Sequence, residues 1–210
     1  MDYFTTTSSA AKRVTDCVIV GVYDSGKLSA GAADIDAASN GELRRLVKSG
    51  DISTKPGRCV LLTRLPGIKA ARVAVVGLGK SGELDTRNFC RAVAAAIGSV
   101  SESKCRDVLI TLTLEDVGDA NVYYRARQGV QTVGDVLYRF TEMKSSGNNA
   151  RMPLRKLGLS VASRADAGKA MLGAKHGDAI VTGMSLAKDL GNLPPNVCTP
   201  TYLARTAQKL

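Results

Sequence analysis

Short runs of β-branched and aliphatic residues alternate with longer amphipathic runs along the 210-residue chain. The expected strands cover residues 16–23, 59–62, 72–76, 107–112 and 157–161. The expected helices cover residues 35–48, 85–100, 122–140, 165–190 and 201–210. Strands that alternate with helices form a largely parallel sheet with helices on both faces. The sequence therefore predicts an α/β fold, with three α/β/α layers around one sheet.

The strands 59–62 and 72–76 depart from this alternation. They are separated by a short segment with Leu65-Pro66-Gly67, which is a turn signal. We expect them to pair as an antiparallel hairpin, so the predicted sheet is mixed.

The C-terminal part of the chain predicts a change of domain. The last long helix is expected to stop at Gly191-Asn192, just before Pro194-Pro195. Thr199-Pro200 then opens a capped helix in which the sequence ends. We expect three parts: an N-terminal domain over residues 1–162, a long connecting helix over 163–191, and the truncated start of a further domain over 192–210.

Targeting signals and paired cysteines are missing from the sequence. No apolar run approaches the ~20 residues that a membrane-spanning helix needs, and residues 1–16 lack the apolar core of a signal peptide. The five cysteines are widely spaced and include no Cys-x-x-Cys pair, which disfavours a disulfide framework and a zinc site. We therefore expect a cytoplasmic protein with reduced thiols and no membrane partner.

The formal net charge of +10 is concentrated in the last third of the chain, where residues 121–210 contain 13 basic and 5 acidic side chains. The candidate phosphate contacts are Arg139, Lys144, Arg151, Arg155, Lys156, Arg164 and Lys169. Because the chain has no Trp and only 4% aromatic residues, base stacking is disfavoured. We expect any nucleic-acid partner to be duplex DNA held by its phosphate backbone. The alternative is a basic face turned to solvent or to the rest of a longer protein.

The segment Gly77-Leu78-Gly79-Lys80-Ser81-Gly82 matches the dinucleotide-binding pattern G-x-G-x-x-G directly after a strand. However, the next helix is expected to begin near Asp85, after the third glycine, and no acidic residue ends a strand about 20 positions later. The glycine spacing also excludes a P-loop. We therefore interpret Gly77, Gly79 and Lys80 as a structural glycine turn.

Candidate catalytic and metal-binding residues do not emerge from the sequence. His176 is the only histidine, the chain has no Gly-x-Ser-x-Gly segment, and its carboxylates are too sparse and scattered to indicate an acid/base pair or a two-metal site. We therefore expect no catalytic residue and no metal ligand within these 210 residues.

Residues 186–203, Leu-Ala-Lys-Asp-Leu-Gly-Asn-Leu-Pro-Pro-Asn-Val-Cys-Thr-Pro-Thr-Tyr-Leu, closely resemble the segment that enters the catalytic domain of leucyl (cytosol) aminopeptidases. Upstream, the chain is similar to that family in its macro-domain-like α/β region and its long connecting helix. The strand followed by Gly77-Leu78-Gly79-Lys80 and then Leu84-Asp85-Thr86-Arg87 fits the same pattern. The resemblance extends over essentially all 210 residues.

The resemblance implies the N-terminal assembly or regulatory domain of a cytoplasmic enzyme that removes N-terminal amino acids from peptides by two-metal hydrolysis. In that family the two divalent ions, Mn or Zn, belong to the catalytic domain, which begins near Asn192. We therefore expect no cofactor and no peptidase activity in these residues alone.

The resemblance also implies three partners: the catalytic domain of the same protein, the other subunits of a homo-hexamer and, as for some bacterial relatives, DNA. The alternative is a free-standing macro-like module that binds nucleotides or ADP-ribose, suggested by the turn at Gly77–Gly82.

Overall fold

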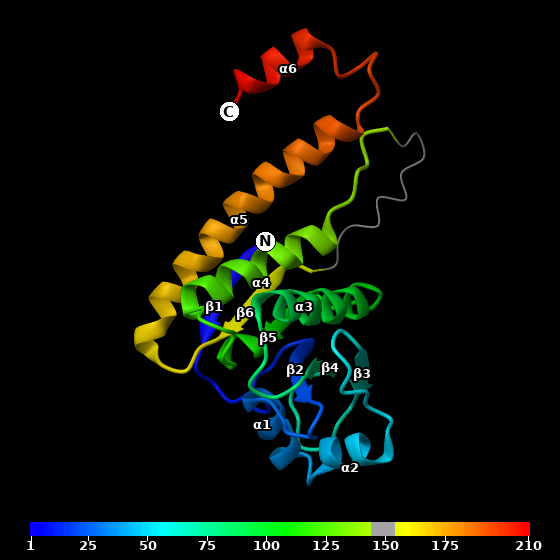
Figure 1. Ribbon diagram of the computed structural model, residues 1–210, viewed down its shortest axis with the longest axis vertical. Coiled ribbons are helices and arrows are strands. Elements are labelled where there is room, and N and C mark those ends of the chain that lie inside the picture. The colour runs from blue at the N-terminus through cyan, green and yellow to red at the C-terminus, as the bar shows by residue number, and fades with distance from the viewer. Residues whose placement is uncertain (144–153) are drawn as a thin grey trace.

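A six-stranded sheet organises the part of the chain that the computed structural model describes, residues 1–143 and 154–210 (Figure 1). The strands are β1 (Asp2–Thr6), β2 (Cys17–Tyr23), β3 (Cys59–Thr63), β4 (Arg72–Gly79), β5 (Asp107–Ile110) and β6 (Lys156–Ser160). Their order across the sheet is β1-β6-β5-β2-β4-β3. Only β3 runs antiparallel, paired with β4 as the predicted hairpin, and every other neighbouring pair is parallel. The predicted α/β class and the mixed, largely parallel sheet are confirmed.

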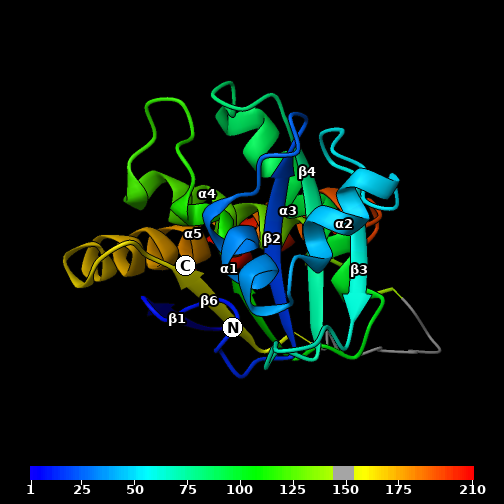
Figure 2. The ribbon, with the colours of Figure 1, turned by 90° about the horizontal axis from the view of Figure 1, so that it is seen from below.

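The helices of the described residues are α1 (Ala30–Ala38), α2 (Glu42–Ser49), α3 (Thr86–Ser101), α4 (Val122–Leu137), α5 (Arg164–Asn192) and α6 (Pro200–Ala207), with a short 3-10 helix at Leu112–Leu114. Helices α3, α4 and α5 lie on one face of the sheet, and α1 and α2 lie on the other (Figure 2). No helix among the described residues is long and apolar enough to cross a membrane.

The centre of the sheet is buried on both faces. All seven residues of β2 are buried, and alternate side chains point to opposite faces. Ile19 belongs to the core that contains Phe89 of α3, whereas Val18 and Val20 belong to the core that contains Ile35 of α1. This alternation explains why the strand reads as a continuous apolar run in the sequence.

Strand β1 was not predicted, because the Thr- and Ser-rich start of the chain reads as a loop. It lies at the edge of the sheet and pairs in parallel with β6 over five residues. The Phe4 ring covers Gly158 of β6, on the face of the sheet that carries α1 and α2 but outside the area that these helices cover. An added Cβ on Gly158 would lie 2.4 Å from Phe4 Cζ. A glycine in β6 therefore provides the space in which this ring packs.

The prediction of a single helix over residues 35–48 is wrong, because the helical conformation is interrupted at Asn40 and Gly41. Both residues have positive φ, 58° and 82°, which ends α1 and turns the chain into α2. The buried Asp36 stabilises the break, since its carboxylate accepts a 3.0 Å hydrogen bond from the Arg44 amide in the first turn of α2. The amphipathic pattern continues across the break, so it predicted one helix.

Several element ends also differ from the prediction, and β4 continues to Gly79 instead of ending at residue 76. Strand β5 stops at Ile110, where the chain enters the 3-10 helix, and α4 stops at Leu137 rather than at Phe140. Helix α5 extends over 29 residues, from the Ser163 cap to Asn192. It coincides closely with the expected connecting helix, while the division of the chain into domains stays a prediction.

Candidate functional site

Gly77 and Gly79, which were expected in a turn, are residues of β4 itself, and backbone hydrogen bonds tie them to the segment before β3. The Gly77 amide donates to the Arg58 carbonyl at 2.8 Å, and the Gly79 amide donates to the Thr54 carbonyl at 3.3 Å. A Cβ on Gly77 would lie 2.2 Å from the Lys55 carbonyl oxygen, and Gly79 has a φ of +80°. These two amides, which a bound phosphate would need, are therefore used by the chain itself.

The neighbouring helix end holds a carboxylate of its own. The Asp85 side chain accepts a 2.7 Å hydrogen bond from the Asn88 amide in the first turn of α3. Lys80 is exposed and lies 3.8 Å from the Glu83 carboxylate. The positive end of α3 is thus already matched by an acidic side chain.

The crevice at the carboxyl ends of β2 and β5 is the place where open α/β sheets commonly bind ligands, because the chain leaves these strands in opposite directions. Here Glu115 occupies it. One carboxylate oxygen accepts from the Ala30 amide at 2.8 Å, and the other accepts from the Tyr23 hydroxyl at 2.7 Å. Burial and this hydrogen bond raise the pKa of Tyr23. The start of α1 therefore already binds an anion, which is a side chain of the protein.

Two of the predicted phosphate contacts, Arg155 and Lys156, lie at the amino end of β6. Their amides both donate to the Arg106 carbonyl, at 2.8 and 3.0 Å, so Arg106 lies directly beside them. Lys156 Nζ and the Arg13 guanidinium both lie over the Phe4 ring, at 5.6 and 4.6 Å from its centroid. We call Arg13, Arg106, Arg155 and Lys156 the basic edge.

No side chain of the basic edge forms an ion pair within 4.0 Å in the part of the chain that the structure describes. The nearby Asp16 carboxylate is engaged by the backbone, since it accepts from the amides of Arg106 and Asp107. Arg13 and Arg106 were not predicted as members. They could have been found by noting that parallel strands begin at the same end of a sheet.

The remaining predicted contacts lie elsewhere or outside the described residues. Arg164 and Lys169 belong to α5, which begins beyond the carboxyl end of β6, so the five-residue strand separates Arg164 from the basic edge by about 15 Å. The Arg139 guanidinium donates to the carbonyls of Val136 and Tyr138 at the end of α4. Lys144 and Arg151 are not among the described residues.

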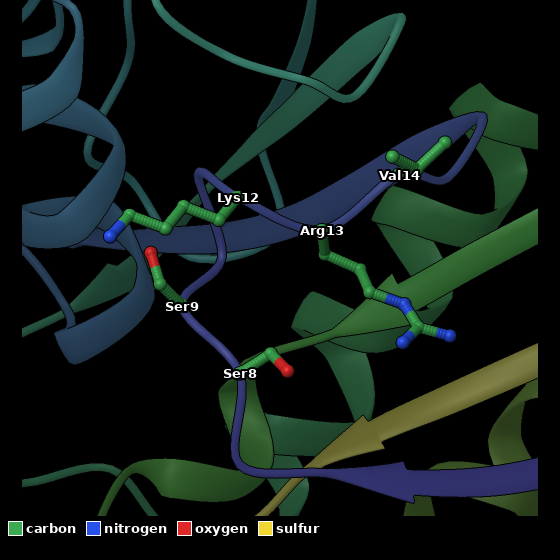
Figure 3. A pocket seen from close by; sticks show the side chains of 5 residues that line it. All are labelled: Ser8, Ser9, Lys12, Arg13 and Val14. Carbon is green, nitrogen blue, oxygen red and sulfur yellow. The ribbon is translucent and has the colours of Figure 1, made fainter.

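A hollow of about 660 Å³ lies beside the basic edge, within the loop from β1 to β2. It is lined by Ser8, Ser9, Lys12, Arg13 and Val14, shown in Figure 3. The Arg13 side chain reaches from the loop toward β6, whereas the Lys12 side chain points in a different direction (Figure 3). The polar side chains of this hollow therefore do not converge on one point.

Helix α5 is packed along its first half and less covered along its second. Small residues lie against α4, where a Cβ on Gly173 would come within 2.3 Å of the Tyr123 carbonyl oxygen. Farther along, Ile180 and Met184 are each 37% exposed, although both are large and apolar. Helix α6 contains no buried residue. The second half of α5 therefore leaves two large apolar side chains partly exposed.

The groups that could support catalysis are dispersed. Within the described residues, no three or more His, Cys, Asp and Glu side chains are placed to hold a metal ion. His176 Nδ1 lies 2.8 Å from the Tyr123 hydroxyl on the exposed side of α4 and α5. Among the described residues, these groups therefore do not converge on one point.

The described residues form an α/β domain with a long helix, α5, leading out of it. Residues 19–147 match the sequence model described as "Cytosol aminopeptidase family, N-terminal domain". The chain belongs to the cytosol aminopeptidase family.

Curated relatives match along the whole chain. Probable cytosol aminopeptidases of Methylobacillus flagellatus and Alkalilimnicola ehrlichii are 40% and 41% identical to it over 210 residues. In both cases the match covers 100% of this chain and 42% of the relative. The chain thus spans less than half the length of these relatives.

Solved structures share the fold. Over the full chain, a mutant of tomato leucine aminopeptidase superposes with a TM-score of 0.80 at 20% identity, and the match covers 42% of that protein. The bottromycin maturation enzyme BotP superposes over 93% of the chain with a TM-score of 0.67 at 24% identity, covering 36% of that protein.

Proposed function

We propose that the chain is the N-terminal domain of a cytosol aminopeptidase, and that it attaches and assembles the peptidase unit rather than performing hydrolysis. The match of residues 19–147 to the family's N-terminal domain carries this proposal. The relatives support it, because the part of them that this chain does not cover is longer than the chain itself.

The divalent ions that such hydrolysis needs do not fit the residues present. Two-metal sites need carboxylate or other ligands placed a few ångströms apart, and the described residues contain no group of three suitable side chains. One solved neighbour, BotP, is described as a complex with Mn. We place the manganese or zinc ligands of the parent enzyme outside these 210 residues.

Helix α5 is the element by which we expect the domain to meet the peptidase unit. Its second half exposes Ile180 and Met184, which would lose contact with water against a covering domain. In the whole protein we propose that this arrangement supports a homo-hexamer in the cytoplasm, where such an enzyme removes N-terminal residues from peptides.

A chimera tests the proposal. The segment of the Methylobacillus flagellatus relative that matches this chain is replaced by it, and hydrolysis of leucine p-nitroanilide is measured with added Mn²⁺. We expect turnover by the chimera and none by the chain alone. A folded chimera that assembles but does not hydrolyse, or Mn²⁺-dependent turnover by the purified chain, would contradict the proposal.

As a second function we propose weak binding of duplex DNA by the basic edge. Four cationic side chains without ion-pair partners among the described residues support it, because each phosphate contact releases counterions and adds affinity. Such binding reaches roughly 10⁻⁴–10⁻⁶ M at physiological salt and reads little sequence. The alternative of an ADP-ribose module is less well supported, because Glu115 occupies the crevice in which the ligand would lie.

A further inference from the structure

Strand β1 presents an open hydrogen-bonding edge. The Asp2 amide donates to the Arg155 carbonyl at 2.9 Å, and the Thr6 carbonyl accepts from the Val161 amide at 2.9 Å. Backbone N–H and C=O groups alternate in direction along a strand. The backbone groups of Phe4 therefore also point toward β6, whereas those of Tyr3 and Thr5 point outward from the edge of the sheet. Apart from the β1–β6 ladder, no hydrogen bond to the backbone groups of Tyr3 or Thr5 is found within the described residues.

The edge is held in place from both faces of the sheet. On one face the Tyr3 hydroxyl donates a 2.6 Å hydrogen bond to Asp178 of α5. On the other face the Phe4 ring lies on Gly158 and under the Arg13 guanidinium. The strand is therefore ordered before any partner arrives, which lowers the entropy lost on pairing.

The usual protections of an edge strand are missing from β1. Its sequence, Asp-Tyr-Phe-Thr-Thr, contains no proline and no lysine, and its register with β6 has no bulge. By contrast, β3 at the opposite edge is flanked directly in the sequence by Arg58 and Arg64. The two edges of this sheet are thus unequal, and β1 is the open one.

We propose that β1 pairs with β1 of a second copy of this chain, antiparallel, across a two-fold axis at Phe4. In this register Tyr3 lies opposite Thr5 of the other copy, and the two pairs exchange four backbone hydrogen bonds. The two Phe4 side chains are then direct neighbours on one face of the joined sheet, where an aromatic pair adds stability.

The ends of the paired strands also match in charge. Asp2 lies opposite Thr6 of the other copy, and Thr6 and Arg164 line one hollow of about 240 Å³. Asp2 of each copy therefore approaches Arg164 of the other copy. The proposal does not depend on the peptidase assignment, because its readout is the association of this chain alone.

Sedimentation equilibrium of the purified chain across micromolar to millimolar concentration tests the pairing. We expect a reversible dimer of twice the 22.0 kDa chain mass. Thr5→Pro removes one outward amide per copy without touching the bonds to β6, a substitution that edge strands tolerate. It should weaken dimerisation by roughly tenfold to a hundredfold, whereas the matched variant Thr5→Val should dimerise like the parent.

Amide exchange keeps the test decisive if Thr5→Pro misfolds. In the parent chain the amides of Tyr3 and Thr5 should exchange rapidly at low concentration and become protected as the dimer forms, while the Phe4 amide stays protected throughout. A chain that stays monomeric, or a dimer in which Tyr3 and Thr5 still exchange rapidly, would overturn the proposal.

Discussion

The Tyr3 hydroxyl hydrogen bonds to Asp178 Oδ1 at 2.6 Å, which joins the first strand to the last long helix across 175 positions of sequence. Asp178 lies midway along α5, at the point where the helix passes β1. This contact ties α5 to the sheet just before its less covered half begins.

Tyr3→Phe removes this bond and keeps the ring. Because the acceptor is a partly buried carboxylate that would lose its partner, we expect the free energy of unfolding to fall by about 1–2 kcal/mol. Amides in the first half of α5 should also exchange faster. Urea unfolding measures the first effect, with Tyr124→Phe as the control, since Tyr124 is 46% exposed. Equal losses in both variants would show that the Tyr3 bond contributes nothing specific.

The tyrosines also predict an alkaline limit to stability. Burial is the main cause that raises the pKa of Tyr3 and of Tyr23 above the ordinary 10.0, and the bonds to Asp178 and Glu115 add to it. The folded state therefore holds these phenol protons more tightly than the unfolded chain does. Their contribution to stability is fully present below about pH 10 and is lost as the pH rises above it.

The measurement is the urea midpoint at about pH 9 and at about pH 11, on either side of the ordinary tyrosine pKa. We expect the parent to lose more stability between these two values than the double variant Tyr3→Phe/Tyr23→Phe. Identical losses would mean that neither tyrosine is linked to unfolding in this range.

The close approach of α4 and α5 makes opposite predictions for two glycines of one helix. A Cβ on Gly173 would lie 2.3 Å from the Tyr123 carbonyl oxygen, which is backbone and cannot move aside cheaply. At Gly183 nothing lies within 4 Å of an added Cβ. Gly173→Ala should therefore lower the free energy of unfolding by about 1–3 kcal/mol.

Gly183→Ala should raise that free energy by roughly 0.5–1 kcal/mol, because alanine loses less backbone entropy in a helix. Thermal unfolding of the two variants is the check. If Gly173→Ala is as stable as Gly183→Ala, the two helices do not approach as closely as described.

The sequence predicted what depends on local pattern and missed what depends on distant contacts. The buried strands β2 and β4 and the helix after Asp85 follow from apolar spacing and a capping residue. The break at Asn40-Gly41 was missed, because the amphipathic pattern runs across it and its support comes from the buried Asp36.

The same distinction applies to the candidate sites. Glu115 reaches the start of α1 from 85 positions away, so no local motif announces that it fills the crevice. Arg106 joins Arg155 and Lys156 only because two parallel strands begin side by side. The charge count identified the last third of the chain as basic, but the strand order decides which cations lie together.

The position of these cations gives the last prediction, for DNA binding. Two double charge reversals alter the net charge equally: Arg155→Glu/Lys156→Glu at the basic edge and Arg164→Glu/Lys169→Glu at the other end of β6. If the basic edge holds duplex DNA, the first variant should lose about tenfold or more in affinity at low salt. Its salt dependence should also become shallower by roughly one unit of slope per lost phosphate contact. The second variant should bind nearly like the parent.

Gel shifts and fluorescence anisotropy at several salt concentrations measure both quantities, and circular dichroism checks the fold. Equal losses would indicate a diffuse charge effect, and unchanged affinity in both variants would exclude this surface as the DNA site.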